Sequence, residues 1–445
     1  MTALTTTKPK RDLEAFPAHV IGVPGVLGDM IRWTEACSIR SAPVLSLGAC
    51  IGAFSTVMGR WYKTRTGLRA NLYLVGLARS GAGKENGRSC AMTMLSRSGL
   101  SSMRGTDDVA SSAGLLRVIG DFPVRLFCLD EIGLMLGNVT SNKAGTHERD
   151  ILSVLMRLHS CAGTLWAGKA YAEKDAKPIE QPHACVWGTS TPERFWSALS
   201  GSHTIDGFLN RLLVLPLDGE IPSLRDPTAD PSTPPADILE ALQRIGSGEA
   251  LQRNGGNLEA MITRSTRTES YQVPQTDEAT RLLAEAAERQ RWQQNNSPCP
   301  EAWTRALEMV QKLSLVAAVS ERPEAPAIDA QHVRWAGYIA WWSIRRSASA
   351  AEERVGDTDE QRATRAILGA VRRASATGQG LTLAGLTKTC WRFDRRQRDA
   401  GLRNLLDGGQ VIEETEIRRG KTVKVFGIAT ENELDYHSTT TELLG

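Results

Sequence analysis

A glycine-rich loop followed by a lysine is the first stretch of this chain whose residue types could do chemistry. Residues 78–84 read ARSGAGK, directly after the apolar run 72–75 and ahead of a segment that can continue as a helix. Strand, glycine-rich loop, lysine and helix, in that order, form the context of a phosphate-binding loop (P-loop), because the glycines let successive backbone N–H groups turn towards phosphate oxygens. The helix N-terminus adds its positive dipole end. We expect the nucleotide-binding residues to be Ser80, Gly81, Ala82, Gly83, Lys84 and Glu85.

Two positions of this loop depart from the usual pattern. Ala78 stands where the first glycine is expected, which is a mild change because Gly81 keeps the loop permissive. Glu85 stands where a serine or threonine would hold Mg²⁺. Its carboxylate either repels the phosphates or serves as an unusual ligand to Mg²⁺, and both interpretations stay open.

A second apolar run ends in two acids. Residues 124–131 read VRLFCLDE, the form of a Walker B strand. Asp130 would then hold Mg²⁺ directly or through water, and Glu131 would polarise the water that attacks a phosphate. The two elements together predict ATP and Mg²⁺ as cofactors and a phosphoryl-transfer reaction.

The elements that must position these residues alternate between strand and helix. Apolar strands are expected at 124–131, 184–188 and 212–216, with helical patterns between them. This alternation predicts an α/β fold with a parallel sheet covered on both faces, which places ligands at the carboxyl ends of the strands. Thr189 and Ser190 follow one strand, and Arg211 precedes another.

This order of motifs resembles the ring-forming P-loop ATPases of the AAA+ type. The resemblance implies that Thr189 or Ser190 orients the attacking water and that Arg211 is an arginine finger reaching the γ-phosphate in a neighbouring subunit. Three helical patterns over 276–348 resemble the helical lid of such ATPases, where Arg305 would touch nucleotide as a second sensor. A surface charge at a helix end would also explain Arg211, and a plain amphipathic helix would also explain Arg305.

Residues 163–182 read as a β-hairpin. It resembles the inserted pore hairpin of hexameric DNA helicases, with Lys169, Lys174 or Lys177 facing a phosphate backbone. A solvated β-turn explains the same pattern equally well.

Four segments in this order resemble one family: NLYLVGLARSGAGKE, LFCLDEIG, WGTSTPERF and GFLNRLLVLP. The chain is similar over residues 15–348 to the phage, plasmid and island-borne P-loop proteins called primase- or helicase-associated. The resemblance implies an ATP-driven DNA replication motor, hexameric and MCM-like, with single-stranded DNA in its pore. No primase zinc ribbon or acidic primase core is visible, so a primase would be a separate partner.

The C-terminal part is basic. Residues 361–427 carry fourteen Lys or Arg against six Asp or Glu, a net charge of +8, whereas the rest of the chain carries −5. Helices expected at 363–374, 381–390 and 394–407, followed by two strands about the turn 418–420, make a winged helix. Its candidate DNA-binding residues are Arg395, Arg396, Arg398 and Arg403 on the third helix and Arg418, Arg419 and Lys421 at the wing tip. This charge favours duplex DNA as the partner, although many winged helices contact only protein.

The amino-acid composition indicates the kind of protein and the number of its domains. The 445 residues, 41% hydrophobic and 23% charged, are typical of a soluble protein with two or three domains. The eight scattered cysteines, the absence of a secretory pattern and the absence of an apolar run of about 18 residues predict a cytoplasmic protein without a membrane partner. The expected divisions are 1–60 N-terminal helices, 61–218 ATPase core, 219–275 Pro-rich linker or insert, 276–348 lid, 349–361 linker, 362–429 winged helix and 430–445 tail.

The hypothesis from sequence is an ATP-dependent DNA helicase or origin-melting ATPase of a mobile element, acting as a homo-oligomer. Two alternatives remain. One is a DNA-binding scaffold that does not hydrolyse nucleotide, and the other is a DNA-bound loader ATPase that does not unwind.

Overall fold

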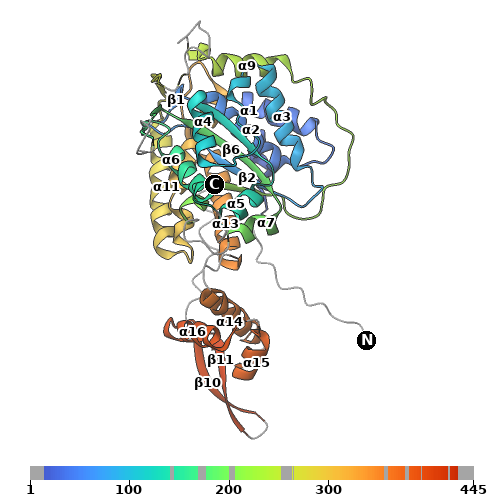
Figure 1. The fold of residues 1–445 in the computed structure, drawn as a ribbon, viewed down its shortest axis with the longest axis vertical. Coiled ribbons are helices and arrows are strands. Elements are labelled where there is room, and N and C mark those ends of the chain that lie inside the picture. The colour runs from blue at the N-terminus through green and yellow to red at the C-terminus, as the bar shows by residue number, and fades with distance from the viewer. Residues whose placement is uncertain are drawn as a thin grey trace. The chain divides into compact units, whose positions relative to one another are not determined.

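The computed structural model describes residues 15–140, 145–168, 177–199, 206–251, 263, 265–354, 359–375, 380–391, 393–418 and 421–428. The chain divides into a large unit within residues 1–352 and a small unit within 353–445 (Figure 1). Each unit has a hydrophobic core of its own.

A four-stranded parallel sheet lies at the centre of the large unit. Its strands are β2 (Tyr73–Leu77), β3 (Val124–Leu129), β6 (His183–Ser190) and β7 (Leu212–Pro216), in the order β3-β6-β2-β7. Leu77 lies opposite both Ser190 and Pro216, so the carboxyl ends of three strands meet at one edge. Nearly every strand residue is buried, as expected of a parallel sheet covered on both faces. The predicted parallel sheet is confirmed.

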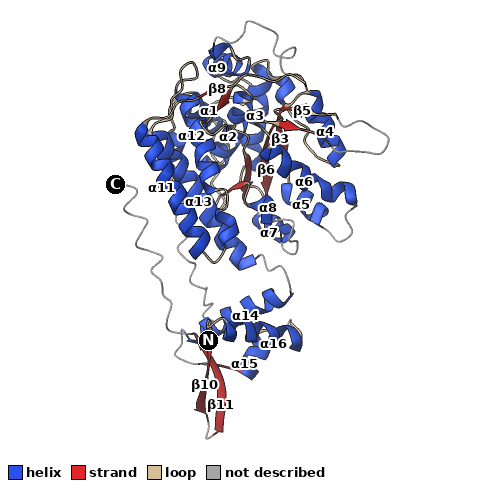
Figure 2. Cartoon of the chain, turned by 90° about the vertical axis from the view of Figure 1, so that its left-hand side faces the viewer, coloured by secondary structure: helices blue, strands red, loops and turns tan. Residues whose placement is uncertain are grey.

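Helices cover the sheet on both sides (Figure 2). The helix α2 (Pro43–Met58) packs across all four strands and is buried along almost its whole length, because its residues are apolar or small. Around it lie α1 (Val26–Ala36), α3 (Lys84–Arg97) and α9 (Ala236–Gly246). The other side holds α5 (Ile132–Thr140) and α6 (Thr146–Ser160), with α4 (Ser112–Asp121) and α7 (Pro192–Leu199) packed on them.

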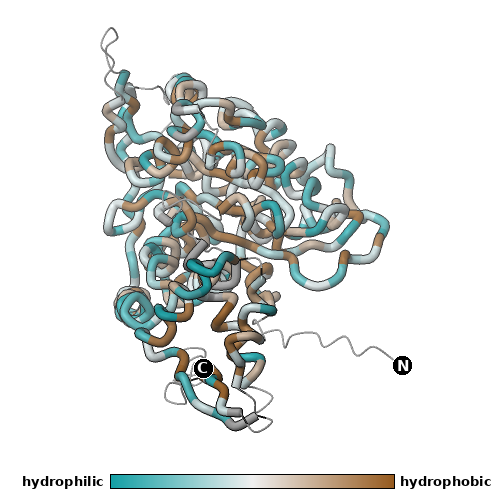
Figure 3. Tube along the Cα trace, turned by 60° about the horizontal axis from the view of Figure 1, so that its bottom comes forward, coloured by the Kyte–Doolittle hydropathy of each residue, from teal (hydrophilic) through white to brown (hydrophobic). Residues whose placement is uncertain are grey.

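The indole of Trp187 fixes the distance between α2 and the sheet. It lies against Gly48 of α2 and Gly76 of β2, where an added Cβ would come within 2.4 Å and 2.7 Å of the ring. Apolar segments gather in the interior of the large unit (Figure 3), and Trp187 belongs to its hydrophobic core. A side chain larger than glycine at either position would push the helix away from the sheet.

Three long helices close the large unit: α11 (Asp277–Asn296), α12 (Ala306–Glu321) and α13 (Ala330–Arg354). The N-terminal residues pack against them. The Trp335 indole donates to the Val20 carbonyl (2.8 Å), and the Ser320 hydroxyl accepts from the Leu27 amide (2.9 Å) and donates to the Pro24 carbonyl (2.7 Å). The first and last segments of the large unit therefore form one packed layer.

The Pro-rich segment 219–236 is not a free linker. Its backbone pairs with residues 36–41, and the Arg225 guanidinium donates to the Ser38 and Glu35 carbonyls. The helices α13 and α14 extend into the second expected linker, 349–361, since α13 continues to Arg354 and α14 begins at Asp359. Residues 355–358 between them lie outside the described residues.

The shorter elements complete the large unit. The base of the expected hairpin is present, where β4 (Leu165–Trp166) pairs antiparallel with β5 (Ile179–Glu180). A second small pair, β1 (Tyr62–Lys63) with β8 (Tyr271–Gln272), is parallel. Among the described residues of this unit, the remaining short helices are Ala18–Gly22, Ser101–Met103, α8 (Asp206–Leu209), Glu249–Leu251 and Pro300–Trp303.

The small unit contains three helices and an antiparallel sheet. They are α14 (Asp359–Ser375), β9 (Leu381–Thr382), α15 (Leu383–Thr389), α16 (Arg395–Asp407), β10 (Val411–Arg418) and β11 (Lys421–Ile428), with strand order β10-β11-β9. Asp394 caps α16 by accepting from the Gln397 amide (2.8 Å), as its sequence predicts. Ile367, Leu405 and Phe426 lie in the core that joins helices to sheet.

Within the described residues of both units, no helix has the length and apolar character needed to cross a membrane.

Candidate active site

The glycine-rich loop lies at the carboxyl edge of the sheet, between β2 and α3. Gly81 and Gly83 have φ of 78° and 86°, which glycine adopts without the strain that a Cβ would bring. Gly83 is the N-cap of α3, and Lys84 is the first helical residue. The sequence therefore builds a loop that ends at a helix N-terminus, a combination that binds anions.

Lys84 meets the acid pair at this edge. Its ammonium lies 3.1 Å from Oε1 of Glu131, and the Lys84 side chain is only 10% exposed. A second cation, Arg194 at the start of α7, lies 3.6 Å from Oε2 of Glu131. Arg194 is not among the site residues predicted from sequence, although it follows the Thr-Ser end of β6 by only a few residues. The Glu131 carboxylate is thus held between two cations, and a phosphate would compete with it for both.

Glu131 has an unusual backbone. Its φ is 50°, a left-handed conformation that costs a non-glycine residue about 1–3 kcal/mol. Its amide donates to Oδ1 of Asp130 at 3.0 Å, which anchors the turn. Strain of this kind persists where the surroundings fix it, and it clusters at functional sites.

The end of β6 brings its two hydroxyls to the two acids. The Thr189 hydroxyl donates to Oδ1 of Asp130 (3.2 Å), and the Ser190 hydroxyl lies 3.4 Å from Oε2 of Glu131. Both hydroxyls are buried, whereas Asp130 is exposed. The structure therefore brings Lys84, Asp130, Glu131, Thr189 and Ser190 together, as the sequence predicts, with β6 inserted between the loop-bearing and acid-bearing strands.

Glu85 points along the surface of α3. Its carboxylate accepts from Arg88 at 2.6 Å, one helical turn away, and the Glu85 side chain is 61% exposed. This pairing raises the pKa of Arg88 through its hydrogen bond with Glu85. Arg88 therefore offsets the negative charge that the departure from the usual motif introduces.

Residues 36–41 border the loop on its other side. A Cβ added at Gly83 would lie 3.4 Å from the Cβ of Arg40, and Asn86 of α3 donates to the Thr34 carbonyl (2.8 Å). The Arg40 guanidinium donates to the carbonyl of Pro222. The stretch of chain that contains Thr34 and Arg40 therefore contacts both the Pro-rich segment and the region of the P-loop.

Arg211 and Arg305 lie at the opposite, amino edge of the sheet. Arg211 immediately precedes β7, whose first residue pairs with the first residue of β2. Because β2 spans five residues at about 3.3 Å each, roughly 16 Å of strand separates this position from the P-loop. Arg305 is the N-cap of α12 and pairs with Glu308 (2.5 Å).

A buried charged cluster surrounds these arginines. The Lys312 ammonium is almost fully buried and lies 2.9 Å from Glu308, 3.0 Å from the Asn71 carbonyl and 3.3 Å from Nε2 of His159. Burial lowers the pKa of Lys312. Burial also lowers the pKa of His159, and the nearby charges of Lys312 and Arg305 add to this effect, so that this pKa lies well below its usual range. Burial also lowers the pKa of Arg211, and nearby Arg305 adds to the effect. Cations outnumber carboxylates in this cluster, because Glu308 is the one acid among the named groups.

The structure describes only part of the candidate DNA-binding set. Lys177 is exposed ahead of β5, whereas Lys169, Lys174 and Arg419 lie outside the described residues. Arg418 ends β10 and Lys421 begins β11, at the two sides of the turn.

The four arginines of α16 differ in exposure. Arg395, Arg396 and Arg403 are exposed, whereas Arg398 is partly buried and donates to the Phe393 carbonyl. At about 100° per residue, the three exposed arginines fall within one arc of about 100° on the helix.

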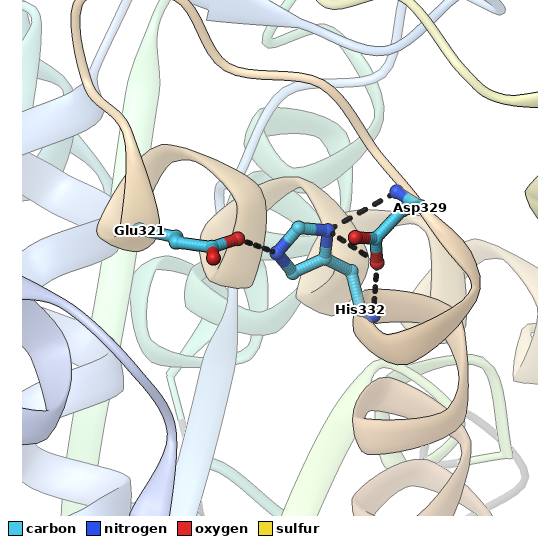
Figure 4. Close-up of side chains that lie close together, drawn as sticks. All are labelled: Glu321, Asp329 and His332. Carbon is cyan, nitrogen blue, oxygen red and sulfur yellow. Dashed lines mark hydrogen bonds and ion pairs between the residues drawn. The ribbon is translucent and has the colours of Figure 1, made fainter.

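A second group with metal-ligand character lies between α12 and α13. Glu321, Asp329 and His332 bring one ligand atom each within 4.8 Å of one another (Figure 4). Nδ1 of His332 accepts the Asp329 backbone N–H (3.1 Å), and its Nε2 lies 3.0 Å from Glu321. Asp329 in turn accepts the amides of Gln331 and His332 as the cap of α13. Both ring nitrogens are engaged, so we assign this cluster to the turn between the helices, and Asp130 remains the candidate Mg²⁺ ligand.

No protein-family model matches this chain, and a search of curated proteins found no significant match.

Proposed function

We propose that this chain is an ATPase that uses ATP and Mg²⁺ to act on DNA, as a helicase or origin-melting enzyme of a mobile element. The convergence of Lys84, Asp130, Glu131, Thr189 and Ser190 at the carboxyl edge of the sheet carries the proposal. In this reading the large unit has an AAA+-like core, with α11–α13 as its lid, and the small unit is a winged helix.

Each residue of the site has a distinct task. The loop amides, the α3 N-terminus and Lys84 would hold the β- and γ-phosphates. Asp130 would bind Mg²⁺, which supplies charge neutralisation on the phosphate oxygens. Glu131 would accept a proton from the attacking water, with Ser190 and Thr189 fixing the orientation of the two acids. Arg194 is a further cation that would contact the γ-phosphate once Glu131 turns to the water.

The placement of Arg211 supports an oligomer. An arginine at the amino edge cannot reach the P-loop of its own chain across the length of β2, but it can reach the carboxyl edge of a second copy. Arg211 lies near Arg305, and these two partly exposed arginines would offer positive charge to a phosphate group of that neighbour. ATP would then lie between subunits of a ring.

ATP turnover with and without single-stranded DNA tests the proposal. We expect DNA-stimulated turnover in the parent, and Glu131→Gln should abolish turnover while nucleotide binding, followed with a fluorescent ATP analogue, persists. Lys84→Ala should lose binding as well. Strand displacement on a forked duplex would then separate a helicase from a loader. Turnover absent from the parent, with DNA binding intact, would favour the non-hydrolysing scaffold.

A mixing experiment tests the shared site. Arg211→Ala and Glu131→Gln are each expected to be inactive alone. If ATP lies between subunits, a mixture regains activity, because some interfaces pair an intact Glu131 from one chain with an intact Arg211 from the other. If Arg211 acts within its own chain, no chain in the mixture has a complete site and activity stays absent.

A further inference from the structure

Trp391 is the most exposed large hydrophobic side chain among the described residues, at 79%. It lies in the turn between α15 and α16 of the small unit. Cys390 and Phe393, which lie close to it in the chain, are buried in the core. Two backbone hydrogen bonds, from Cys390 to Leu386 (2.8 Å) and from Phe393 to Cys390 (3.1 Å), fix the turn. The indole is therefore held in solvent by an ordered support.

The helix that follows Trp391 in the chain, α16, begins with two arginines. Arg395 and Arg396 occupy the first turn of α16, and the Arg395 side chain is 91% exposed, with Asp399 at 3.6 Å. Arginines in the first turn of a helix are electrostatically unfavourable, because that end carries the positive pole of the helix dipole. The N-cap Asp394 and the carboxylate of Asp399 offset part of this positive charge. Both arginines nevertheless remain exposed to solvent.

We propose that Trp391 stacks on an unpaired base of DNA while Arg395 and Arg396 contact the adjoining phosphates. The inference rests on the proposed DNA-binding function and names which DNA the small unit prefers. An aromatic face beside arginines is the combination that binds single strands, because every base offers a π-face and every nucleotide a phosphate. In a closed duplex both faces of each base are covered by neighbouring bases. The small unit therefore favours single-stranded DNA, or the open end of a duplex, over continuous duplex.

The occupant is a nucleic acid rather than a lipid surface. A helix that lies on a membrane needs a continuous apolar face, whereas the outward arc of α16 carries Arg395, Arg396, Asp399 and Arg403. The single indole of Trp391 matches one base, and the arginines of α16 match a backbone of regularly spaced phosphates.

Binding of the full-length chain to labelled oligonucleotides tests the proposal. The DNA probes are a single strand, the same strand with abasic sites in place of its bases, and a relaxed closed-circular duplex, and anionic vesicles are the lipid probe. Because stacking on one base contributes about 1–3 kcal/mol, Trp391→Ala should weaken single-strand binding roughly 5- to 150-fold. The abasic strand should bind Trp391→Ala and the parent equally, and Trp391→Phe should lose less than Trp391→Ala. Trp292→Ala is the matched control, because Trp292 is also exposed (53%) but lies on α11 of the large unit.

Three outcomes would overturn the inference. The first is single-strand binding of Trp391→Ala equal to that of the parent. The second is that Trp391→Ala loses binding equally on the intact and the abasic strand. The third is that Trp391→Ala loses binding to anionic vesicles without losing binding to DNA. The double variant Arg395→Glu/Arg396→Glu separates this inference from the proposed function, since it should weaken binding to all three DNA probes. DNA binding that falls in the arginine variant but not in Trp391→Ala removes the stacking role alone, whereas a parent that binds no DNA removes both.

Discussion

Glu85 and Arg88 show how a single residue pair can compensate for a departure from a binding motif. The Glu85 carboxylate stands at the helix position where a hydroxyl is usual, and Arg88 pairs with it on the exposed face of α3. Removing the arginine would leave an unpaired negative charge within one turn of the phosphate-binding loop. The net charge of the Glu85–Arg88 pair, rather than the charge of Glu85 alone, therefore acts on the phosphates of a bound nucleotide.

We expect Arg88→Ala to raise the KM for Mg–ATP several-fold, with a smaller change in kcat, because freed Glu85 repels the phosphates. Glu85→Ser should remove the repulsion, so the double variant should return the KM towards that of Glu85→Ser alone. Steady-state kinetics of the four proteins measure the coupling between the two residues. If Glu85 is instead a ligand to Mg²⁺, Glu85→Ser by itself would raise the Mg²⁺ concentration needed for turnover.

A second expectation at the residue scale concerns acid. His183 is fully buried, and burial lowers its pKa to about 3. An unfolded chain protonates histidine near pH 6.5, so the unfolded state binds more protons between those values and stability falls as pH decreases. The slope from this residue is at most about 1.4 kcal/mol per pH unit.

Urea unfolding at pH 7.5, 6.0 and 5.0 measures this effect. At pH 7.5, His183→Gln should be less stable than the parent, because the His183 Nε2 contact with the Ser55 carbonyl (2.9 Å) is altered. On acidification it should lose less stability than the parent, because it lacks the buried histidine. His147→Gln is the control, since His147 is exposed. Parallel pH profiles for the parent and His183→Gln would exclude the histidine as the source of acid sensitivity.

At the scale of elements, α2 carries two glycines that the structure distinguishes sharply. A Cβ at Gly48 would lie 2.4 Å from the Trp187 ring and 2.7 Å from Leu215, whereas a Cβ at Gly52 would meet its nearest neighbour at 3.5 Å. We expect Gly48→Ala to destabilise the large unit by about 1–3 kcal/mol through overpacking. Gly52→Ala should stabilise it by about 0.5–1 kcal/mol, because alanine favours the helix. Urea unfolding compares the two, and equal effects would contradict the packing of α2 on Trp187.

The local motifs of the site could be predicted from sequence because each one is a short pattern. The strand, loop and helix around Lys84, the acids after β3 and the cap at Asp394 all depend on residues within one or two turns of chain. The cap of α4 shows the limit of such patterns: Thr106, Asp107, Asp108 and Ser111 are all residue types that cap helices, and Ser111 is the one that accepts the amide of Gly114 (3.1 Å). Several capping residues stand close together there, and local pattern does not choose between them.

Long-range placements could not be read from the sequence. The left-handed backbone of Glu131 and its contact with Arg194 depend on how α5 and α7 meet β6. The position of Arg305 at the amino edge follows from the direction of α12, and the order of the Pro-rich segment follows from hydrogen bonds to residues 36–41. Each of these depends on residues far apart in the chain.

At the scale of the whole molecule, two separate cores predict two unfolding events. Leu405 lies in the small-unit core and is 2% exposed, so Leu405→Ala should cost about 2–5 kcal/mol. Differential scanning calorimetry should show one transition moving down by several degrees while the other stays in place. Asn404→Ala, at the neighbouring exposed position, is the control. A single transition that moves as a whole would mean that the two units unfold together.

The packing of residues 20–27 against Ser320 and Trp335 has a consequence for how the protein is made. The ribosome delivers the apolar helix α2 early, but the segments that complete its layer leave the exit tunnel some 300 residues later, since the Leu27–Ser320 and Val20–Trp335 contacts span 293 and 315 positions. At about 5–20 residues per second, that interval lasts roughly 15–60 s. The large unit therefore closes only near the end of its own synthesis. A nascent chain halted before α12 would leave uncovered the surfaces of α1 and α2 that contact α12, and we expect it to depend on chaperones.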